Sequence, residues 1–294
     1  MATAERRPLG ASGVTVSAIG VGTNRWSAGS NDTPVLATWK ALADGGIDFI
    51  DTAEVYGFGK SERLVGQCVA SGSAEALVAT KFAPFIARTS ARQLVGALDR
   101  SLARLGRTSV DLYYVHFPFP FASLTAFADG LAEAVKSGKA KAVGVSNFNA
   151  DDTKRMAELL GQRGTCLAAN EIHYSLLNRA PETNGVLAAC KEVGASLVAY
   201  FPLASGRLAG RADAHGDPRT QKLLRALSAV AEAHQASVGE VALAWLLARD
   251  PCIIPIPGAT KAAHAAANAR AMSLQLTPEE FAAIDAASPP APAA

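Results

Sequence analysis

Hydrophobic residues alternate along the 294-residue chain between short apolar runs and longer segments in which they recur with a helical spacing. The apolar runs predict strands near residues 19–22, 49–51, 77–81, 110–116, 142–146, 167–172, 196–200 and 253–256. The helical spacing predicts helices over residues 34–43, 62–70, 91–105, 124–137, 152–160, 185–193, 221–234, 238–249 and 262–270. Eight consecutive strand–helix units indicate an α/β fold, a single (β/α)8 TIM barrel. A doubly wound sheet also alternates, but it usually has fewer strands and a topological switch point.

The chain before the first of these strands has a different pattern. Gly and Ser residues between Leu9 and Val14 stand where a tight turn is expected, which predicts a short β-hairpin from Arg6 to Ser17. No linker or shift in composition divides the rest of the chain, so we expect one domain over residues 1–294. Its Pro-rich end, residues 288–294, is predicted to be a disordered tail.

Composition narrows the class of protein. Hydrophobic residues make up 49% of the chain and charged residues 18%, which is typical of a soluble globular protein. The net charge of +2 gives no electrostatic reason to expect nucleic acid or an anionic membrane as partner. No long apolar segment and no secretory signal are evident. Four widely spaced cysteines predict reduced thiols in the cytoplasm and no metal site; the oligomeric state stays open.

Four polar residues lie at or just beyond three consecutive strands: Asp51, Tyr56, Lys81 and His116. Alone, Asp51 is typical of a helix cap, Tyr56 of a packing residue and His116 of a satisfied core residue, while Lys81 fits a solvated rim or a paired site equally well. Together they change the interpretation, because the carboxyl ends of neighbouring parallel strands meet at one rim. We therefore expect these four side chains, the tetrad, to form a catalytic group.

The tetrad has the chemistry needed to protonate a carbonyl oxygen. Free tyrosine, with a pKa of about 10, is a weak acid at neutral pH. We expect Lys81 to lower the pKa of Tyr56 and Asp51 to hold Lys81, while His116 orients the carbonyl. None of these groups supplies a hydride, so a cofactor must do so.

The remaining strand ends are candidates for holding that cofactor. Ser146 and Asn147, Glu171, Tyr200 and the loop over residues 202–210 follow three of them, and the segment Pro257–Lys261 follows the last strand before a helix. Each has an ordinary alternative: a helix cap, barrel packing or a flexible connection. No Gly-x-Gly-x-x-Gly follows a strand, so a Rossmann site is not indicated.

At these residues the chain resembles the aldo-keto reductase superfamily, from about Arg6 to Ala287. The resemblance is carried by the segments Asp51–Gly57, Ser101–Gly106, Gly144–Phe148 and Ile256–Ala259, together with Ser61-Glu62, Lys81 and His116. It implies a barrel closed at its bottom by a β-hairpin and NADPH-dependent reduction of aldehydes and ketones, with Tyr56 as proton donor. The cofactor contacts it implies are Gly22, Thr23, Asp51, Ser146, Asn147, Glu171, Tyr200, Pro202, Leu203, Ser205, Gly206, Leu208, Gly258, Lys261, His264 and Asn268.

The chain departs from the family pattern where the cofactor is expected. Glu171 replaces the usual Gln, and Thr260 stands where a basic residue is common. We therefore predict NADPH as cofactor, with NADH possible but weaker, and Lys261 as the cation for its 2′-phosphate. Glu171 is expected either to accept from the nicotinamide amide or to lie in solvent or pair with an Arg or Lys.

Aromatic residues near the strand ends predict an apolar pocket for a small carbonyl compound. The expected substrate contacts are Trp26, Tyr56, Phe82, His116 and Phe117. The favoured hypothesis is an NADPH-dependent carbonyl reductase. The alternatives are a nucleotide-binding regulatory subunit with little turnover on the same barrel, and an isomerase or lyase that uses Lys81 as a Schiff base.

Overall fold

The computed structural model describes residues 5–28, 33–72, 75–209 and 217–290. Its main sheet contains eight parallel strands whose order in space follows their order in the chain. They are β3 (Val21–Gly22), β4 (Phe49–Asp51), β5 (Leu77–Phe82), β6 (Val110–Val115), β7 (Ala140–Ser146), β8 (Leu167–His173), β9 (Ser196–Tyr200) and β10 (Ile253–Ile256). The amides of Gly20 and Gly22 donate to the carbonyl oxygens of Pro255 and Pro257 at 2.9 and 3.2 Å, which joins the first strand to the last. The predicted (β/α)8 barrel is confirmed.

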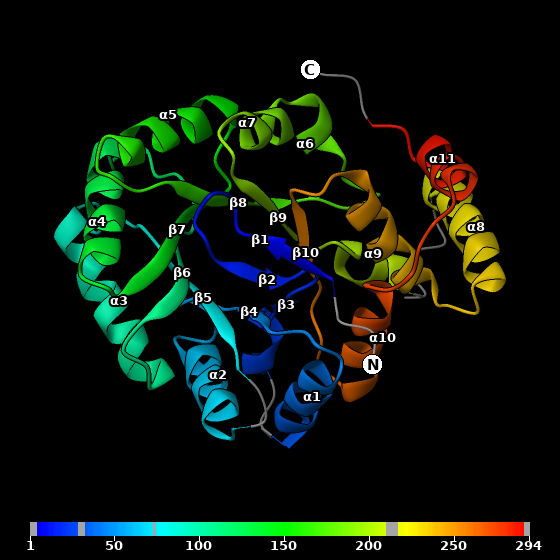
Figure 1. Ribbon diagram of the computed structural model, residues 1–294, viewed down its shortest axis with the longest axis horizontal. Helices are drawn as coiled ribbons and strands as arrows, with labels where there is room; N and C mark the ends of the chain where they lie inside the picture. Colours follow the sequence, from blue (N-terminus) through cyan, green and yellow to red (C-terminus); the bar gives the residue numbers. More distant parts are fainter. Residues whose placement is uncertain (1–4, 29–32, 73–74, 210–216, 291–294) are drawn as a thin grey trace.

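Helices surround this barrel (Figure 1). They are α1 (Thr33–Asp44), α2 (Lys60–Ala70), α3 (Ala91–Leu105), α4 (Leu124–Lys136), α5 (Ala150–Gly161), α6 (Ala180–Thr183), α7 (Val186–Glu192), α8 (Pro218–Ala233), α9 (Val238–Arg249), α10 (Ala262–Ala271) and α11 (Pro278–Ala287). Capping boxes begin α3, α9 and α11, where Ser90, Ser237 and Thr277 satisfy free backbone donors of the first turn. All predicted helices are present, and α6, α11 and 3₁₀ helices over Asn24–Ala28 and Ala204–Ala209 are additional.

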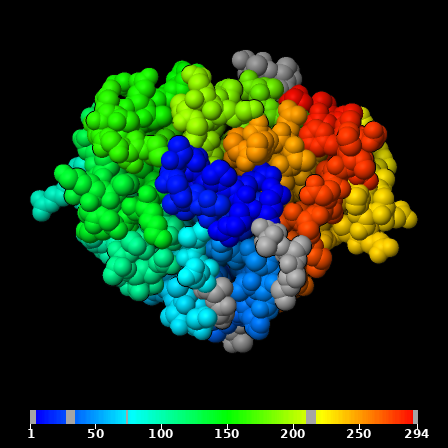
Figure 2. All heavy atoms as spheres, viewed as in Figure 1, coloured from blue at the N-terminus to red at the C-terminus, as the bar shows by residue number. Residues whose placement is uncertain are grey.

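The predicted hairpin consists of β1 (Arg6–Pro8) and β2 (Thr15–Ser17), which pair antiparallel. It lies over the centre of the barrel end that faces the viewer in Figures 1 and 2, where it is coloured dark blue. Leu9 is fully buried and packs with the residues that fill the barrel interior. Arg7 donates to the carbonyl oxygens of Leu247 and Ile253 at 2.8 and 2.7 Å. The hairpin therefore closes the bottom of the barrel, and the opposite end carries the strand termini.

Side chains alternate in direction along each strand, and this alternation determines which of them point into the barrel. Phe49, Ala79, Leu112, Val198 and Ile254 share one interior cluster. Because side chains two residues apart on a strand share a face, the positions two residues further along β4, β5 and β9 also point inward. Those positions are occupied by Asp51, Lys81 and Tyr200 at the open end of the barrel.

Tyr114 on β6 fills the interior just below Lys81. It is fully buried, and its ring centroid lies 5.7 Å from Lys81 Nζ. A Cβ atom at Gly144 on the neighbouring β7 would lie 2.7 Å from this ring. Glycine at position 144 therefore makes room for an aromatic floor beneath the polar residues.

The predicted tail is described only at its start. Arg179 donates to the Ser288 carbonyl oxygen at 2.6 Å, and the Ser288 hydroxyl donates to the carbonyl of Leu176. The disorder of residues 288–294 stays a prediction. Residues 291–294 of the predicted tail lie outside the described residues. All four cysteines are free thiols. Within the described residues, no helix combines the length and apolar character needed to cross a membrane.

Candidate active site

The tetrad predicted from the sequence comes together at the open end of the barrel. Lys81 Nζ donates to Asp51 Oδ1 and, at 3.0 Å, to the carbonyl oxygen of Thr52. The same atom lies 3.4 Å from the Tyr56 hydroxyl, and the Tyr56 and His116 rings meet edge to face with centroids 5.7 Å apart. Asp51 and Lys81 are buried, whereas Tyr56 and His116 are partly exposed. The arrangement runs from a buried ion pair outward to a phenol and an imidazole.

Lys81 is an ammonium ion held by carboxyl groups. Burial alone would lower its pKa, but Asp51 and Glu171 outweigh burial and raise the pKa of Lys81 above its ordinary value. Its side chain is fully buried, so water does not compete for this charge. An amine that stays protonated is a poor nucleophile, which argues against Schiff-base chemistry at Lys81.

The expected lowering of the Tyr56 pKa by Lys81 is present, but a larger effect opposes it. Burial raises the pKa of Tyr56 above its usual value, and the opposing effect of Lys81 is smaller. Asp51, and Glu171 whenever it is ionised, also disfavour the phenolate and raise the pKa of Tyr56. Tyr56 therefore keeps its proton at neutral pH.

His116 is a neutral imidazole in this environment. Burial, with a smaller contribution from Lys81, lowers the pKa of His116 to about 3. Its Nδ1 atom is buried and has no hydrogen-bond partner. The backbone around it is fixed, because the His116 amide donates to Phe82 O at 2.8 Å and the Asn147 side chain donates to His116 O at 3.1 Å. The ring can thus offer one N–H to an oxygen atom without carrying charge.

A set of contacts that we did not predict holds the loop that carries Tyr56. The Glu54 carboxylate accepts from the Ala83 amide at 2.8 Å and from Arg88 at 2.8 and 3.1 Å. Glu54 precedes Tyr56 in the loop after β4, while Ala83 and Arg88 belong to the loop after β5. Two neighbouring strand-end loops are therefore clamped together around the phenol. Only the position of Glu54 inside the Asp51–Gly57 motif hinted at this role.

A second unpredicted group anchors the start of α2. The Ser61 hydroxyl lies 2.7 Å from Thr23 Oγ1 and accepts from Thr52 Oγ1 at 2.9 Å. Thr23 also donates to Asp51 O through its hydroxyl at 2.8 Å. Glu62 is buried, accepts from Thr80 at 2.7 Å and pairs with Arg104. These contacts explain why Ser61-Glu62 accompanies the tetrad in the sequence.

Further along the same rim, beyond His116, Ser146, Asn147 and Tyr200 form one hydrogen-bonded group. Asn147 Nδ2 donates to Ser146 Oγ, and the Tyr200 hydroxyl donates to Asn147 Oδ1, both at 2.9 Å. Asn147 adopts a left-handed backbone with φ of 62°. His173 stacks on the Tyr200 ring with centroids 5.4 Å apart. Three of the predicted cofactor contacts are therefore assembled at one place on the rim.

The loop after β9 carries unusual backbone geometry. Phe201, Ala204, Ser205 and Gly206 all have positive φ angles, between 48° and 94°. Such conformations are costly for residues other than glycine and collect at functional sites. Pro202, Leu203 and Leu208 belong to the same turn, where the Leu208 amide donates to Leu203 O at 3.2 Å. Leu208 is fully buried, so its contact with the cofactor stays a prediction.

The residues predicted for the adenosine end surround the start and one face of α10. Asn268 is buried, and its Nδ2 donor has no partner. Lys261 is the exposed N-cap residue of α10, and His264 is also exposed. Gly22 and Gly258 form a parallel β-bridge where the barrel closes. A buried amide donor without a partner, on a helix whose start carries the exposed Lys261 and His264, fits a bound nucleotide.

Glu171 lies deeper than its predicted role requires. Its side chain is 4% exposed, and its Oε2 atom lies 3.3 Å from Lys81 Nζ. Its backbone carbonyl accepts from Ser146 Oγ at 3.0 Å and from the Asn147 amide at 2.9 Å. Pairing with a lysine was one of the alternatives expected from the sequence, and the structure places Glu171 in such a pair. A contact with nicotinamide stays a prediction.

The predicted substrate contacts outside the tetrad differ in how exposed they are. Phe82 is fully buried and packs against Phe127 of α4, with ring centroids 6.4 Å apart, so its selection as a substrate contact is wrong. It follows Lys81 directly and therefore points out of the barrel, toward the helices. Trp26 is 3% exposed, and its indole donates to Ala259 O at 2.7 Å. Of the three predicted contacts outside the tetrad, Phe117, whose ring centroid lies 5.7 Å from that of His116, is the one that is partly exposed.

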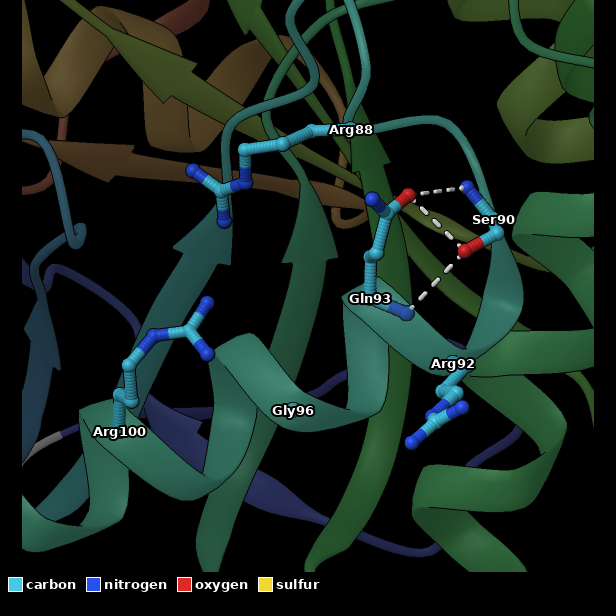
Figure 3. A pocket seen from close by; sticks show the side chains of 6 residues that line it. All are labelled: Arg88, Ser90, Arg92, Gln93, Gly96 and Arg100. Atoms are coloured by element: carbon cyan, nitrogen blue, oxygen red, sulfur yellow. Dashed lines mark hydrogen bonds between the residues drawn. The ribbon is translucent and has the colours of Figure 1, made fainter.

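A separate hollow of about 590 Å³ runs along α3 and is lined by Arg88, Ser90, Arg92, Gln93, Gly96 and Arg100 (Figure 3). Ser90 and Gln93 are occupied with each other in the capping box drawn there. None of the tetrad residues lines this hollow. It is a surface groove outside the barrel end, and the chemistry described above does not depend on it.

Comparisons with known proteins agree with this geometry. The sequence model of the aldo/keto reductase family matches residues 18–289. The 6-dehydroglucose reductase of Novosphingobium aromaticivorans is 36% identical over 293 residues, spanning 95% of this chain and 93% of the relative. The chloroplastic pyridoxal reductase of Arabidopsis thaliana is 29% identical, spanning 91% of this chain and 82% of the relative. An aldo-keto reductase from Klebsiella pneumoniae in complex with NADPH superposes with a TM-score of 0.83 at 28% identity, covering 98% of this chain and 96% of that one.

Proposed function

Because the chain belongs to the aldo/keto reductase family and is an NADP-dependent oxidoreductase, we propose that it reduces aldehydes and ketones with Tyr56 as the proton donor. The observation that carries the proposal is that Asp51 and Tyr56 both contact the Lys81 ammonium. It contacts Asp51 on its buried side and the Tyr56 hydroxyl, at 3.4 Å, on its outer side. Any phenolate that forms at Tyr56 lies beside the fixed positive charge of Lys81.

The protonation states of Tyr56 and His116 suit the proposed proton donation. Tyr56 retains its proton at neutral pH because burial raises its pKa, so it starts the reaction as an acid. His116, with a pKa of about 3, is neutral and donates a hydrogen bond that orients the substrate oxygen. As that oxygen gains negative charge, it becomes a stronger base and accepts the Tyr56 proton. General-acid catalysis of this kind contributes roughly 10²–10⁴-fold.

The chain has residues that fit the nicotinamide cofactor. Ser146, Asn147 and Tyr200 would hold the nicotinamide end, while Asn268 and Lys261 would hold the adenosine end, where the buried Asn268 Nδ2 lacks a partner. When bound, NADPH supplies the hydride that no side chain here provides. Lys261 is the proposed contact of the 2′-phosphate, and NADH is expected to bind more weakly.

The substrate is a small carbonyl compound that reaches Tyr56 and His116 past an apolar edge. Phe117 packs against His116, and Phe85, 46% exposed, packs against Phe117 with centroids 6.1 Å apart. Arg88 covers the Phe85 ring at 5.9 Å and is itself tied to Glu54. These contacts favour aldehydes with an aryl or alkyl group over highly charged ones.

The test is consumption of NADPH with a panel of aryl and alkyl aldehydes, using Tyr56→Phe as the matched variant. Turnover by the unmodified protein and its loss in Tyr56→Phe, with NADPH still bound, would support the proposal. Bound NADPH without turnover of any aldehyde would instead favour a nucleotide-binding regulatory subunit. Turnover retained in Tyr56→Phe would remove Tyr56 from the acid role.

A further inference from the structure

Glu171 is a third ionisable group beside Lys81 that the proposed chemistry does not use. It projects from β8, and Asp51 projects from β4, four strands away in the eight-stranded order. The two carboxyl groups therefore approach Lys81 from opposite walls of the barrel. Glu171 Oε2 lies 3.3 Å from Lys81 Nζ, and Asp51 Oδ1 accepts from the same atom. All three side chains are at most 4% exposed.

The charges of this cluster do not balance if both carboxyl groups are ionised. Within the described part of the chain, Lys81 is the ion-pair partner of both, and it carries one positive charge. The other titratable groups that act on this interior are Tyr56, Tyr114 on β6, His116 after β6 and Tyr200 on β9, all uncharged at neutral pH. An uncompensated buried charge is strongly unfavourable. The cluster therefore reaches neutrality by keeping one proton.

The unpaired atoms indicate where that proton lies. Asp51 Oδ2 and Glu171 Oε2 are both buried and form no hydrogen bond, although Glu171 Oε2 lies 3.3 Å from Lys81 Nζ. A hydrogen bond between the two carboxyl groups contributes to the pKa shifts of both. Two carboxylates offer only acceptors, whereas a protonated carboxyl group also donates. Burial and Asp51 both raise the pKa of Glu171 well above its ordinary value. Asp51 has the closer contact with Lys81, so Asp51 is the carboxylate and Glu171 is the acid.

We propose that Glu171 is a positioning residue of this reductase, a neutral carboxylic acid that donates to Asp51 and so keeps Asp51 aligned on the Lys81 ammonium. This inference rests on the proposed function, because it is through Lys81 that Glu171 acts on Tyr56. Loss of the Glu171 proton at alkaline pH adds a negative charge to the cluster. That charge disfavours the Tyr56 phenolate, so proton donation slows as Glu171 ionises.

Infrared spectroscopy of the protein across pH tests the protonation directly and requires no turnover. We expect a carboxylic-acid carbonyl absorption at neutral pH that fades as the pH is raised and is absent from Glu171→Gln. The matched control is Glu240→Gln, because Glu240 is equally buried but pairs with Arg270, and its pKa is lowered by Arg270 and Ser237 against the effect of burial. The absorption should persist in this control. Its absence from the unmodified protein, or its persistence in Glu171→Gln, overturns the proposal.

The pH profile of kcat provides the second readout, with Glu171→Gln and Glu171→Leu. Gln keeps a donor toward Asp51 at every pH, so its alkaline decline should begin at higher pH than that of the unmodified protein. Leu removes the donor, so kcat should fall at every pH and be partly restored by Gln. Superimposable profiles of the unmodified protein and Glu171→Gln overturn the proposal. If no variant reduces any carbonyl compound, the proposed function fails while the infrared result still decides the state of Glu171.

Discussion

Replacing Lys81 by Met should stop carbonyl reduction and destabilise the fold, and both effects have one cause. Met keeps most of the side-chain volume but removes the cation that Asp51 contacts, and the Asp51 side chain is only 2% exposed. Breaking a buried ion pair by deleting one partner costs about 3–5 kcal/mol. For a chain of 294 residues, that cost should lower Tm by about 5–8 °C.

The size of this loss should depend on pH. Without Lys81, burial remains the first cause that raises the pKa of Asp51 and of Glu171 above their ordinary values. A carboxyl group with a raised pKa in the folded state contributes stability that is fully present below its unfolded pKa, at about 4, and is lost as pH rises through the folded pKa. The slope is up to about 1.4 kcal/mol per pH unit for each proton. The variant should therefore approach the unmodified protein in stability near pH 4 and fall behind it toward neutral pH.

Thermal unfolding followed by circular dichroism from acid to neutral pH measures this difference. The control is Lys40→Met, the same substitution at a lysine that is 70% exposed and pairs with Asp44 one helical turn away. Exposed pairs of this kind contribute about 0.3–0.5 kcal/mol, so its Tm should barely change. A Lys81→Met protein with an unchanged Tm at neutral pH would refute the reasoning, as would a loss that is the same at every pH.

Tyr56→Phe should lower kcat at least 10²-fold, since the general acid is lost, while its NADPH Kd and Tm stay close to those of the unmodified protein; a weakened Kd would indicate that the hydroxyl serves binding instead. Lys261→Ala should reduce the preference for NADPH over NADH by up to about tenfold in kcat/KM and leave the NADH values unchanged; equal efficiency with both cofactors before mutation would contradict the assignment. His116→Gln should remove part of the acid instability between about pH 6.5 and pH 3, because a histidine whose folded pKa is lowered to about 3 loses stability as pH falls through that window; identical acid-unfolding curves would exclude this. Glu171→Gln should leave the ratio of NADPH to NADP⁺ dissociation constants unchanged at neutral pH and alter it only at alkaline pH, where the native carboxyl ionises; a difference already present at neutral pH would mean that Glu171 is charged there.

The barrel could be predicted because its signal is local. A strand buried on both faces is a short apolar run, and each run here is followed by a segment with helical spacing. The helix α11 was missed although Thr277, Pro278 and Glu280 form a recognisable start, a capping box with Pro in the first turn. The four-residue helix α6 is too short to give any periodic signal.

Site residues were predicted correctly where their place along a strand determines their position. They were missed where contacts between distant segments determine it. Asp51 and Lys81 were found because Asp51 is the last residue of its strand and Lys81 the last but one. Phe82 was misplaced, although its position directly after Lys81 already assigns it to the opposite face. The Glu54–Arg88 pair joins residues 34 apart through two loops, so no spacing in the sequence reveals it.

The sign of the Tyr56 pKa shift shows what a residue pattern cannot supply. A lysine beside a tyrosine favours the phenolate, but the depth at which both lie determines how strongly burial opposes it. Here burial is the larger effect, and the pKa of Tyr56 rises. A phenol with a strongly lowered pKa would be partly ionised in the resting enzyme. The ionised fraction would have no proton to donate. Tyr56 instead holds its proton until charge develops on the substrate oxygen, and the Lys81 ammonium then stabilises the phenolate that remains. The buried cation therefore acts late in the proton transfer, which is why its removal should cost activity without first changing the protonation of Tyr56.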